Sequence, residues 1–482
     1  MSWRTNVPVR ALGAAVMAAL AVSPVRGEAL DPGPLAAANW TEVRTEHFTI
    51  VTDAAASAAG SIGRRLEDFA DLLQTLYPGL RAFPALPTDV YVFRSDAEMK
   101  DFTPKGVESI SGYSMAGTGR SLFVTSAEIE SEERGQVICH EFTHLFIGAN
   151  FADMPLWLNE GLAQYYQTFR QRGGRRADFG HELEGRAEWL DSHPYASLEV
   201  LFAMNTQAHA YQLANELRTT SYTEGWAIVH YLRADRARAA RFDSVLVAMR
   251  RGVAAPTAFR AQFPSDQWEA LIRSVQQYVH TGMLQNSSVT LAAQNDQDTR
   301  DHPLSDADAL AALGDLALAL NADDNATALY KAALEREPGH ARAQAALGYL
   351  ADRAGDSARA EAAYVKAVPA AGKDVRVPLL AALGTQERAH RVYEATKEPS
   401  DAYESYVLAA RARFRRCLEI DPHHPEALGG LGITFLELGV VPDEAVHALE
   451  AATDALPSYD GYRRALRSAR EAHAGGEKKG DP

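Results

Sequence analysis

The chain has 482 residues, a length that predicts two or three domains rather than one. Its residues are 46% hydrophobic and 23% charged, which is typical of a folded soluble protein and too apolar for a mainly disordered one. A formal net charge of −15 argues against general binding to nucleic acid or to an anionic membrane, because either needs a basic surface. Cys139 and Cys417 are too few for a disulfide framework and are expected to be buried free thiols.

The first 27 residues have the layout of a secretory signal peptide. Arg4 and Arg10 precede an apolar run at 11–22, and small residues follow at the positions that favour cleavage before Glu28. The apolar run is shorter than the roughly 20 residues that span a bilayer. We therefore expect an exported protein, periplasmic or secreted, with no membrane span in the mature chain. The alternative is an uncleaved amphipathic start.

The segment 28–283 has a mixed pattern and is expected to form one domain. Alternating and β-branched residues predict strands at 47–52, 89–93 and 121–125, and helical periodicity predicts a helix at 61–76. From Glu132 onward, helical patterns dominate.

The remainder is expected to be a polar linker at 284–303, a helical domain at 304–473 and a disordered tail at 474–482. Within the helical domain a set of positions recurs after 34 residues, namely Leu313, Gly314, Ala326, Tyr330 and Ala333, then Leu347, Gly348, Ala360, Tyr364 and Ala367. This pattern resembles the tetratricopeptide repeat, which implies an all-α solenoid whose concave face binds a protein partner. The alternatives are a plain alanine-rich helical bundle, or a scaffold without a ligand of its own.

The strongest chemical signal is the segment 135–148, which reads GQVICHEFTHLFIG and is predicted to be a buried helix. It nevertheless carries His140, Glu141 and His144, which are costly to bury without partners. His140 and His144 are four residues apart, so their imidazoles leave one face of the helix and can share a metal ion. Glu141 is offset by about 100° around the helix, which suits a general base acting on a metal-activated water.

Glu160 completes a candidate ligand set. It lies in a second predicted helix that begins near Pro155, and 15 residues separate it from His144. Two histidines and one glutamate with an open fourth position are the ligands of a catalytic zinc site, so we expect one Zn²⁺ per chain. The alternative is a pair of core histidines hydrogen-bonded to the backbone.

The motif HEFTH at 140–144, together with WLNEGLA at 157–163, resembles the gluzincin metallopeptidases. It is most similar to the bacterial peptidase-MA-like families and more distantly similar to aminopeptidase N. The resemblance covers 40–283 and implies an α+β zincin-like peptidase domain, here followed by the repeat solenoid. It also implies that His140, His144 and Glu160 hold zinc and that Glu141 is the general base.

The segment YTEGWAIVHYL at 222–232 resembles the part of aminopeptidase N in which a tyrosine opens an apolar helix and steadies the tetrahedral intermediate. The resemblance implies that role for Tyr222. The alternatives are that Tyr222 is a core aromatic at the start of a helix, and that His230 takes its role. From the family's fold we further expect substrate to lie along the strand at 121–125 as an added strand.

The chain also departs from these families. The aminopeptidase motif that holds the substrate's free amine is absent upstream of His140, so exopeptidase activity is not supported. Gln164 stands where thermolysin-like enzymes keep an aspartate behind a zinc-binding histidine, so the residues that orient His140 and His144 are not identified from the sequence.

The sequence therefore predicts an exported zinc-dependent endopeptidase that acts on a peptide or protein substrate. Two alternatives stay open. One is a catalytically idle zinc fold that serves as a peptide- or partner-binding module of the cell envelope. The other is a hydrolase of a non-peptide amide such as a cell-wall crosslink. Glu141 and Tyr222 favour an enzyme, because metal binding alone requires neither of them.

Overall fold

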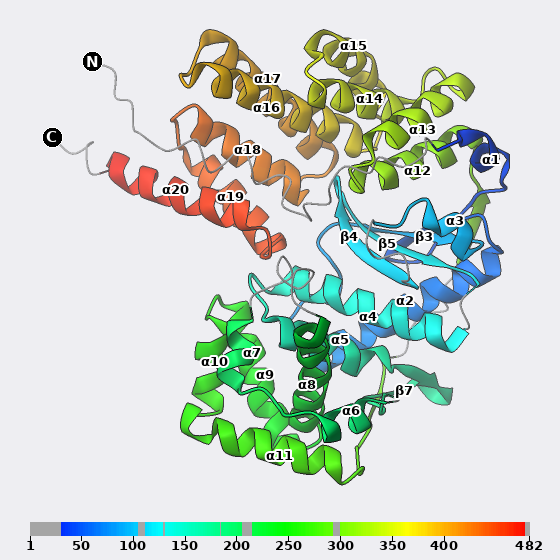
Figure 1. Cartoon of the computed structure of the whole chain (residues 1–482). Helices are drawn as coiled ribbons and strands as arrows, with labels where there is room; N and C mark the ends of the chain where they lie inside the picture. The colour runs from blue at the N-terminus through cyan, green and yellow to red at the C-terminus, as the bar shows by residue number, and fades with distance from the viewer. Residues whose placement is uncertain are drawn as a thin grey trace.

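The computed structural model describes residues 30–104, 111–128, 131–183, 185–204, 215–292 and 299–477. The chain is a mixed α/β protein in which a six-stranded sheet and its helices are followed by a C-terminal region built of helices (Figure 1). The expected signal peptide at 1–27 lies outside the described residues. Within the part of the chain that is described, no helix is both long and apolar enough to cross a membrane.

The larger sheet has the strand order β4-β5-β3-β2-β1-β9. Its strands are β1 (Thr41–Arg44), β2 (Phe48–Thr52), β3 (Thr88–Phe93), β4 (Gly112–Gly117), β5 (Arg120–Ser126) and β9 (Arg300–Pro303). β2, β3 and β5 run parallel, and the other neighbouring pairs are antiparallel. β2, β3 and β5 confirm the strands predicted at 47–52, 89–93 and 121–125.

Helices make up most of the rest of the described chain. Those that precede the C-terminal region are α1 (Pro32–Ala37), α2 (Ala56–Leu76), α3 (Asp96–Lys100), α4 (Ser131–Asn150), α5 (Leu156–Gln167), α6 (Arg186–Ser192), α7 (Leu198–Ala203), α8 (Asn215–Arg233), α9 (Arg236–Arg250), α10 (Ala255–Gln262) and α11 (Trp268–His280). The C-terminal region comprises α12 (Asp306–Ala319), α13 (Asp323–Arg336), α14 (Ala341–Arg353), α15 (Ser357–Ala367), α16 (Arg376–Thr396), α17 (Asp401–Ile420), α18 (Pro425–Glu437), α19 (Asp443–Ala455) and α20 (Asp460–Glu477). α2 confirms the helix predicted at 61–76.

Both faces of the larger sheet are buried. Successive side chains of a strand point to opposite faces, so neighbouring residues of one strand belong to different cores. Ile50 and Val90 face one hydrophobic core, which they share with α2 and α4. Val51 and Tyr91 face a second core, which they share with α12, α13 and α14. The sheet therefore separates the helices that carry the candidate site from the first C-terminal helices, α12, α13 and α14 (Figure 1). The C-terminal region thus begins in a core that belongs to both parts of the chain.

The segment 284–303 differs from the predicted linker. It contributes β8 (Ser287–Thr290) to a small sheet with β6 (Arg170–Arg172) and β7 (Arg176–Phe179), and β9 to the edge of the larger sheet. An edge strand needs backbone hydrogen bonds on one side but few apolar side chains. All four residues of β9 are exposed, so the hydrophobic pattern contains no signal for that strand.

Close contacts between glycine and tyrosine set the spacing of the first two helix pairs in the C-terminal region. A Cβ atom added at Gly314 in α12 would lie 2.6 Å from the ring of Tyr330 in α13. The same distance, 2.6 Å, applies to Gly348 in α14 and the ring of Tyr364 in α15. These are positions of the 34-residue repeat in the sequence, so the repeat corresponds to a repeated packing contact. At the other end of the region, α20 extends to Glu477 and thus into the predicted tail at 474–482.

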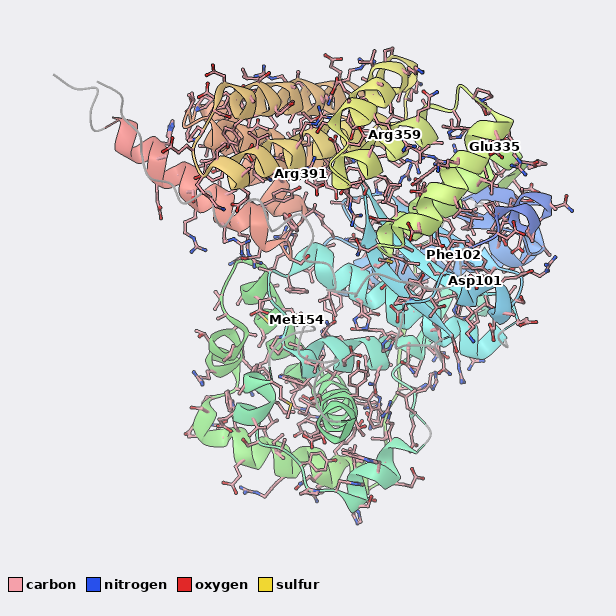
Figure 2. The ribbon with its side chains drawn as sticks, turned by 45° about the horizontal axis from the view of Figure 1, so that its top comes forward. Asp101, Phe102, Met154, Glu335, Arg359 and Arg391 are labelled. Carbon is pink, nitrogen blue, oxygen red and sulfur yellow. The ribbon has the colours of Figure 1, made fainter. Side chains whose placement is uncertain are left out.

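The far end of the C-terminal region also contacts the first part of the chain. Asp454 at the end of α19 accepts hydrogen bonds from Arg81 and Arg250. Arg463 in α20 donates to the carbonyl oxygen of Ala152 at 2.8 Å. Ala152 belongs to the loop between α4 and α5, which Figure 2 marks by the label at Met154. The helical region is therefore held at the sheet by its first helices and at this loop by its last ones.

Candidate metal centre

Helix α4 places His140 and His144 one turn apart on the same face, as their spacing predicts. Their Nε2 atoms lie 3.1 Å apart. The two side chains are 20% and 15% exposed, so the rings are largely buried but still reach solvent. The two Nε2 atoms can therefore both contact a single small group, such as an ion, that lies between them.

Two amide side chains of α5 orient these rings. The Oε1 atom of Gln167 lies 2.9 Å from Nδ1 of His140, and the Oδ1 atom of Asn159 lies 2.9 Å from Nδ1 of His144. Because an amide oxygen only accepts, each Nδ1 carries the hydrogen, and each Nε2 of a neutral ring is left with a lone pair. This is the arrangement that prepares a histidine to bind a metal ion through Nε2.

Neither amide was identified from the sequence. Gln164, the position that corresponds to the aspartate of thermolysin-like enzymes, is buried and makes no side-chain hydrogen bond to the described residues. Gln167 follows Glu160 by two helical turns, so the two share a face of α5. That periodicity is the signal that could have identified Gln167.

Glu160 in α5 brings a carboxylate to the two histidines. Its Oε2 atom lies 3.5 Å from Nε2 of His140, and its Oε1 atom lies 3.7 Å from Nε2 of His144. The three ligand atoms lie within 4.8 Å of one another. Glu160 is only 5% exposed, and its Oε2 has no hydrogen-bond donor among the described residues. A cation between the three side chains would satisfy that buried oxygen and both lone pairs, so the donor set fits a divalent metal ion.

The electrostatics of the cluster favour a positive charge at its centre. Burial opposes ionisation of Glu160, but His144, His140 and the Tyr222 hydroxyl outweigh it and lower the pKa of Glu160. Burial also opposes protonation of His140, yet the hydrogen bond and the charge of Glu160 raise the pKa of His140 to about 9. The site thus attracts either a proton or a metal ion that displaces the proton.

Glu141 lies beside the cluster and is held by the larger sheet. Its Oε2 atom accepts hydrogen bonds from the backbone nitrogen of Ser114 at 2.9 Å and from the Ser114 hydroxyl at 2.8 Å. Ser114 belongs to β4, the edge strand of the sheet. The expected substrate position along 121–125 is wrong, because β5 is paired with β4 on one side and β3 on the other. The strand edge nearest to Glu141 is that of β4.

Tyr222 reaches the cluster from α8, and its hydroxyl hydrogen-bonds Glu160. The sequence predicts that Tyr222 opens this helix, and that prediction is wrong. α8 begins at Asn215, and no glycine or proline interrupts the turns between Asn215 and Tyr222. The approach of α8 to α5 depends on two glycines. A Cβ atom at Gly225 would lie 2.1 Å from the carbonyl oxygen of Trp157, and one at Gly161 would lie 2.4 Å from the carbonyl oxygen of Gly225.

His230 lies outside the cluster. It is 1% exposed, its Nε2 atom lies 2.9 Å from the carbonyl oxygen of Gly180, and its Nδ1 atom lies 2.9 Å from the hydroxyl of Tyr278. Burial lowers the pKa of His230 to about 4. It is a neutral core histidine with both nitrogens bonded, so it does not replace Tyr222.

Comparison with protein-family models and with curated proteins gives no relative from which a function could be transferred. No protein-family model matches the chain, and no curated protein matches it either. Among the described residues, His140, His144 and Glu160 are the one group of three or more histidine, cysteine or acidic side chains that could hold a metal ion. The role of this cluster is therefore inferred from its own chemistry.

Proposed function

We propose that this protein is a zinc-dependent metallopeptidase with a zincin-like catalytic domain. The observation that carries the proposal is that two oriented Nε2 lone pairs converge with the buried carboxylate of Glu160, whose Oε2 atom has no hydrogen-bond partner among the described residues. Two histidines and a glutamate leave one position open for water, which is the donor set of catalytic rather than structural zinc. His140, His144 and Glu160 would hold the ion.

When bound, zinc would act as a Lewis acid that lowers the pKa of a water molecule to about 7 and so makes it nucleophilic. Glu141 is the proton carrier. Its Oε2 atom is occupied by Ser114, so Oε1 takes a proton from the attacking water and later delivers it to the leaving amine. Ser114 fixes the carboxylate and thereby the position from which the proton is transferred.

Tyr222 donates to the oxygen that becomes negatively charged when the scissile carbonyl is attacked. In the chain without substrate its hydroxyl is engaged by Glu160, so Tyr222 changes partner when substrate binds. This exchange costs little, because the hydroxyl has a charged acceptor before and during the reaction.

The helical region supplies a second function in this proposal. Its glycine–tyrosine contacts and the 34-residue period of its sequence support tetratricopeptide-type stacking, which would give a concave surface for a protein partner. With the signal peptide expected at 1–27, the protein would act outside the cytoplasm, as a periplasmic or secreted enzyme.

The proposal is tested by turnover of the zinc-loaded full chain on unfolded casein. We expect cleavage that a chelator stops and that zinc restores. Glu141→Gln should lower the rate by about 100- to 10,000-fold, because the general base is lost while the three ligands remain.

The control is Glu450→Gln, which removes a carboxylate from α19 that pairs with Arg470 at 2.8 Å, away from the cluster. It should cleave casein at the wild-type rate. Full activity of Glu141→Gln would contradict the proposal, and zinc binding without any cleavage by the wild type would favour the idle binding module instead.

A further inference from the structure

Arg186 is a half-buried cation placed close to the metal centre. It is the first residue of α6 and follows Gly185, whose φ of 75° turns the chain into the helix. Its Nη1 atom donates to the Thr223 hydroxyl at 2.8 Å. Thr223 is fully buried in α8 and directly follows Tyr222, so this hydrogen bond fixes the guanidinium beside the candidate catalytic tyrosine.

No carboxylate among the described residues forms an ion pair with Arg186. Arg175, which is also half-buried, pairs with Asp68 and Asp71, and Arg65, which has no ion pair within the described ranges, donates to the carbonyl oxygens of Gly135 and Phe169 instead. Among the described residues, the acid that acts on Arg186 is Glu160, which belongs to the candidate metal centre and forms no ion pair with Arg186. Burial accordingly lowers the pKa of Arg186, because no paired carboxylate offsets the loss of hydration.

A guanidinium has five N–H donors in a flat fork, and Arg186 uses one of them on Thr223. The other donors have no hydrogen-bond partner in the described part of the chain, and they lie in a partly buried place, where a charge-assisted hydrogen bond is strong. Two parallel N–H groups match the two oxygens of a carboxylate better than a single carbonyl oxygen. The group that would offset this charge is therefore an anion supplied by a ligand.

We propose that Arg186 binds a carboxylate of the substrate next to the metal centre, so that the enzyme prefers peptides carrying a carboxylate there. This inference rests on the proposed peptidase function. The carboxylate belongs either to the free C-terminus of the peptide or to an aspartate or glutamate side chain. Arg186 would determine which substrates bind rather than take part in the chemistry, because it binds the substrate's carboxylate and exchanges no proton with it.

A competing role for Arg186 is to keep Glu160 ionised through its charge alone. The two roles separate cleanly. If Arg186 only supports Glu160 electrostatically, a variant without the arginine should bind zinc differently and should still discriminate between the peptides as before. A substrate-binding role would remove the discrimination and leave zinc binding unchanged.

The test uses the full chain with Glu141→Gln, loaded with zinc, so that bound peptide is not consumed. The probes are acetylated tetra-alanine with a free C-terminus, its C-terminal amide, and the amide with one alanine replaced by aspartate, each titrated by calorimetry. We expect one of the two anionic peptides to bind about 10- to 100-fold more tightly than the neutral amide. Which of them does so identifies the source of the carboxylate.

Arg186→Gln should remove this preference while zinc content and affinity for the neutral amide stay unchanged, and Arg186→Lys should keep part of it. The matched control is Arg236→Gln, since Arg236 is likewise the first residue of a helix, α9, but is exposed. An equal affinity for all three peptides, or a preference that survives Arg186→Gln, overturns the proposal. If the chain with Glu141 intact prefers the carboxylate peptide but does not cleave casein, the proposed peptidase function is contradicted, whereas the anion site at Arg186 is supported.

Discussion

Gln167 and Asn159 orient the candidate metal ligands His140 and His144 without being candidate ligands themselves. We expect Gln167→Ala and Asn159→Ala each to weaken zinc binding by about 10- to 100-fold, because the rings lose the bond that fixes tautomer and orientation. Competition with a chromophoric chelator measures this. Gln277→Ala, an exposed glutamine of α11, is the control and should bind zinc as the wild type does.

His230 should make stability depend on pH. Its pKa is about 4 in the folded chain and lies near 6.5 when unfolded, so between these values the unfolded state binds more protons and stability falls as pH falls. The loss from pH 7 to pH 4 is about 3 kcal/mol for this group. Urea unfolding should show a shallower pH dependence in His230→Gln, and parallel curves for the two proteins would contradict this reading.

At the scale of single residues, the sequence identified the candidate metal ligands from their motifs and missed the residues that orient or surround them. The spacing of His140 and His144 and the position of Glu160 predict three groups that the structure brings together. Ser114 and Arg186 lie on β4 and α6, and only tertiary packing places them beside the cluster. No local period connects such positions in the chain, so they could not be found from the sequence.

At the level of secondary structure, the close crossing of α5 and α8 positions the site, because it joins the helix of Glu160 to the helix of Tyr222. Gly225→Ala would bring a Cβ atom to 2.1 Å from the backbone of Trp157, and neither backbone can yield without separating the helices. We expect a loss of about 1–3 kcal/mol of stability together with a loss of casein cleavage.

Gly339→Ala is the matched control for this substitution, because a Cβ atom there meets nothing within 4 Å. Urea unfolding and the casein assay measure both variants side by side. Wild-type stability and activity in Gly225→Ala would show that the helices tolerate a wider spacing and would contradict the account.

The strands that were predicted correctly bury apolar side chains, whereas the missed strands β8 and β9 contain no fully buried residue. β2, β3 and β5 lie inside the sheet and carry a continuous apolar pattern. β8 and β9 lie at sheet edges with polar, largely exposed residues, so only the backbone reveals them. β4 is rich in glycine and small residues, and its place at the edge decides where a substrate strand can be added.

On the scale of the whole molecule, the last C-terminal helices, α19 and α20, contact the first part of the chain at Arg81, at Arg250 and at the loop between α4 and α5. Asp454 is central to this contact, because it accepts from both Arg81 and Arg250. We expect Asp454→Asn to loosen the contact by about 0.5–1 kcal/mol, and high salt to have a similar effect, since the carboxylate is partly exposed.

Hydrogen exchange measures this, and faster exchange is expected in α20 and in the loop around Ala152. Glu450→Gln, which breaks a pair within the helical region, should leave the loop unchanged. If the loop exchanges equally fast in both variants, Asp454 does not hold the two parts together.

Metal content tests the central claim most directly. The full chain is purified without added metal, and zinc is measured by mass spectrometry in the wild type and in Glu160→Gln. We predict about one zinc per wild-type chain and a large loss in the variant, because two neutral imidazoles remain without the carboxylate. A folded wild-type chain without zinc, or the same zinc content in both proteins, would contradict the assignment of His140, His144 and Glu160 as a metal site.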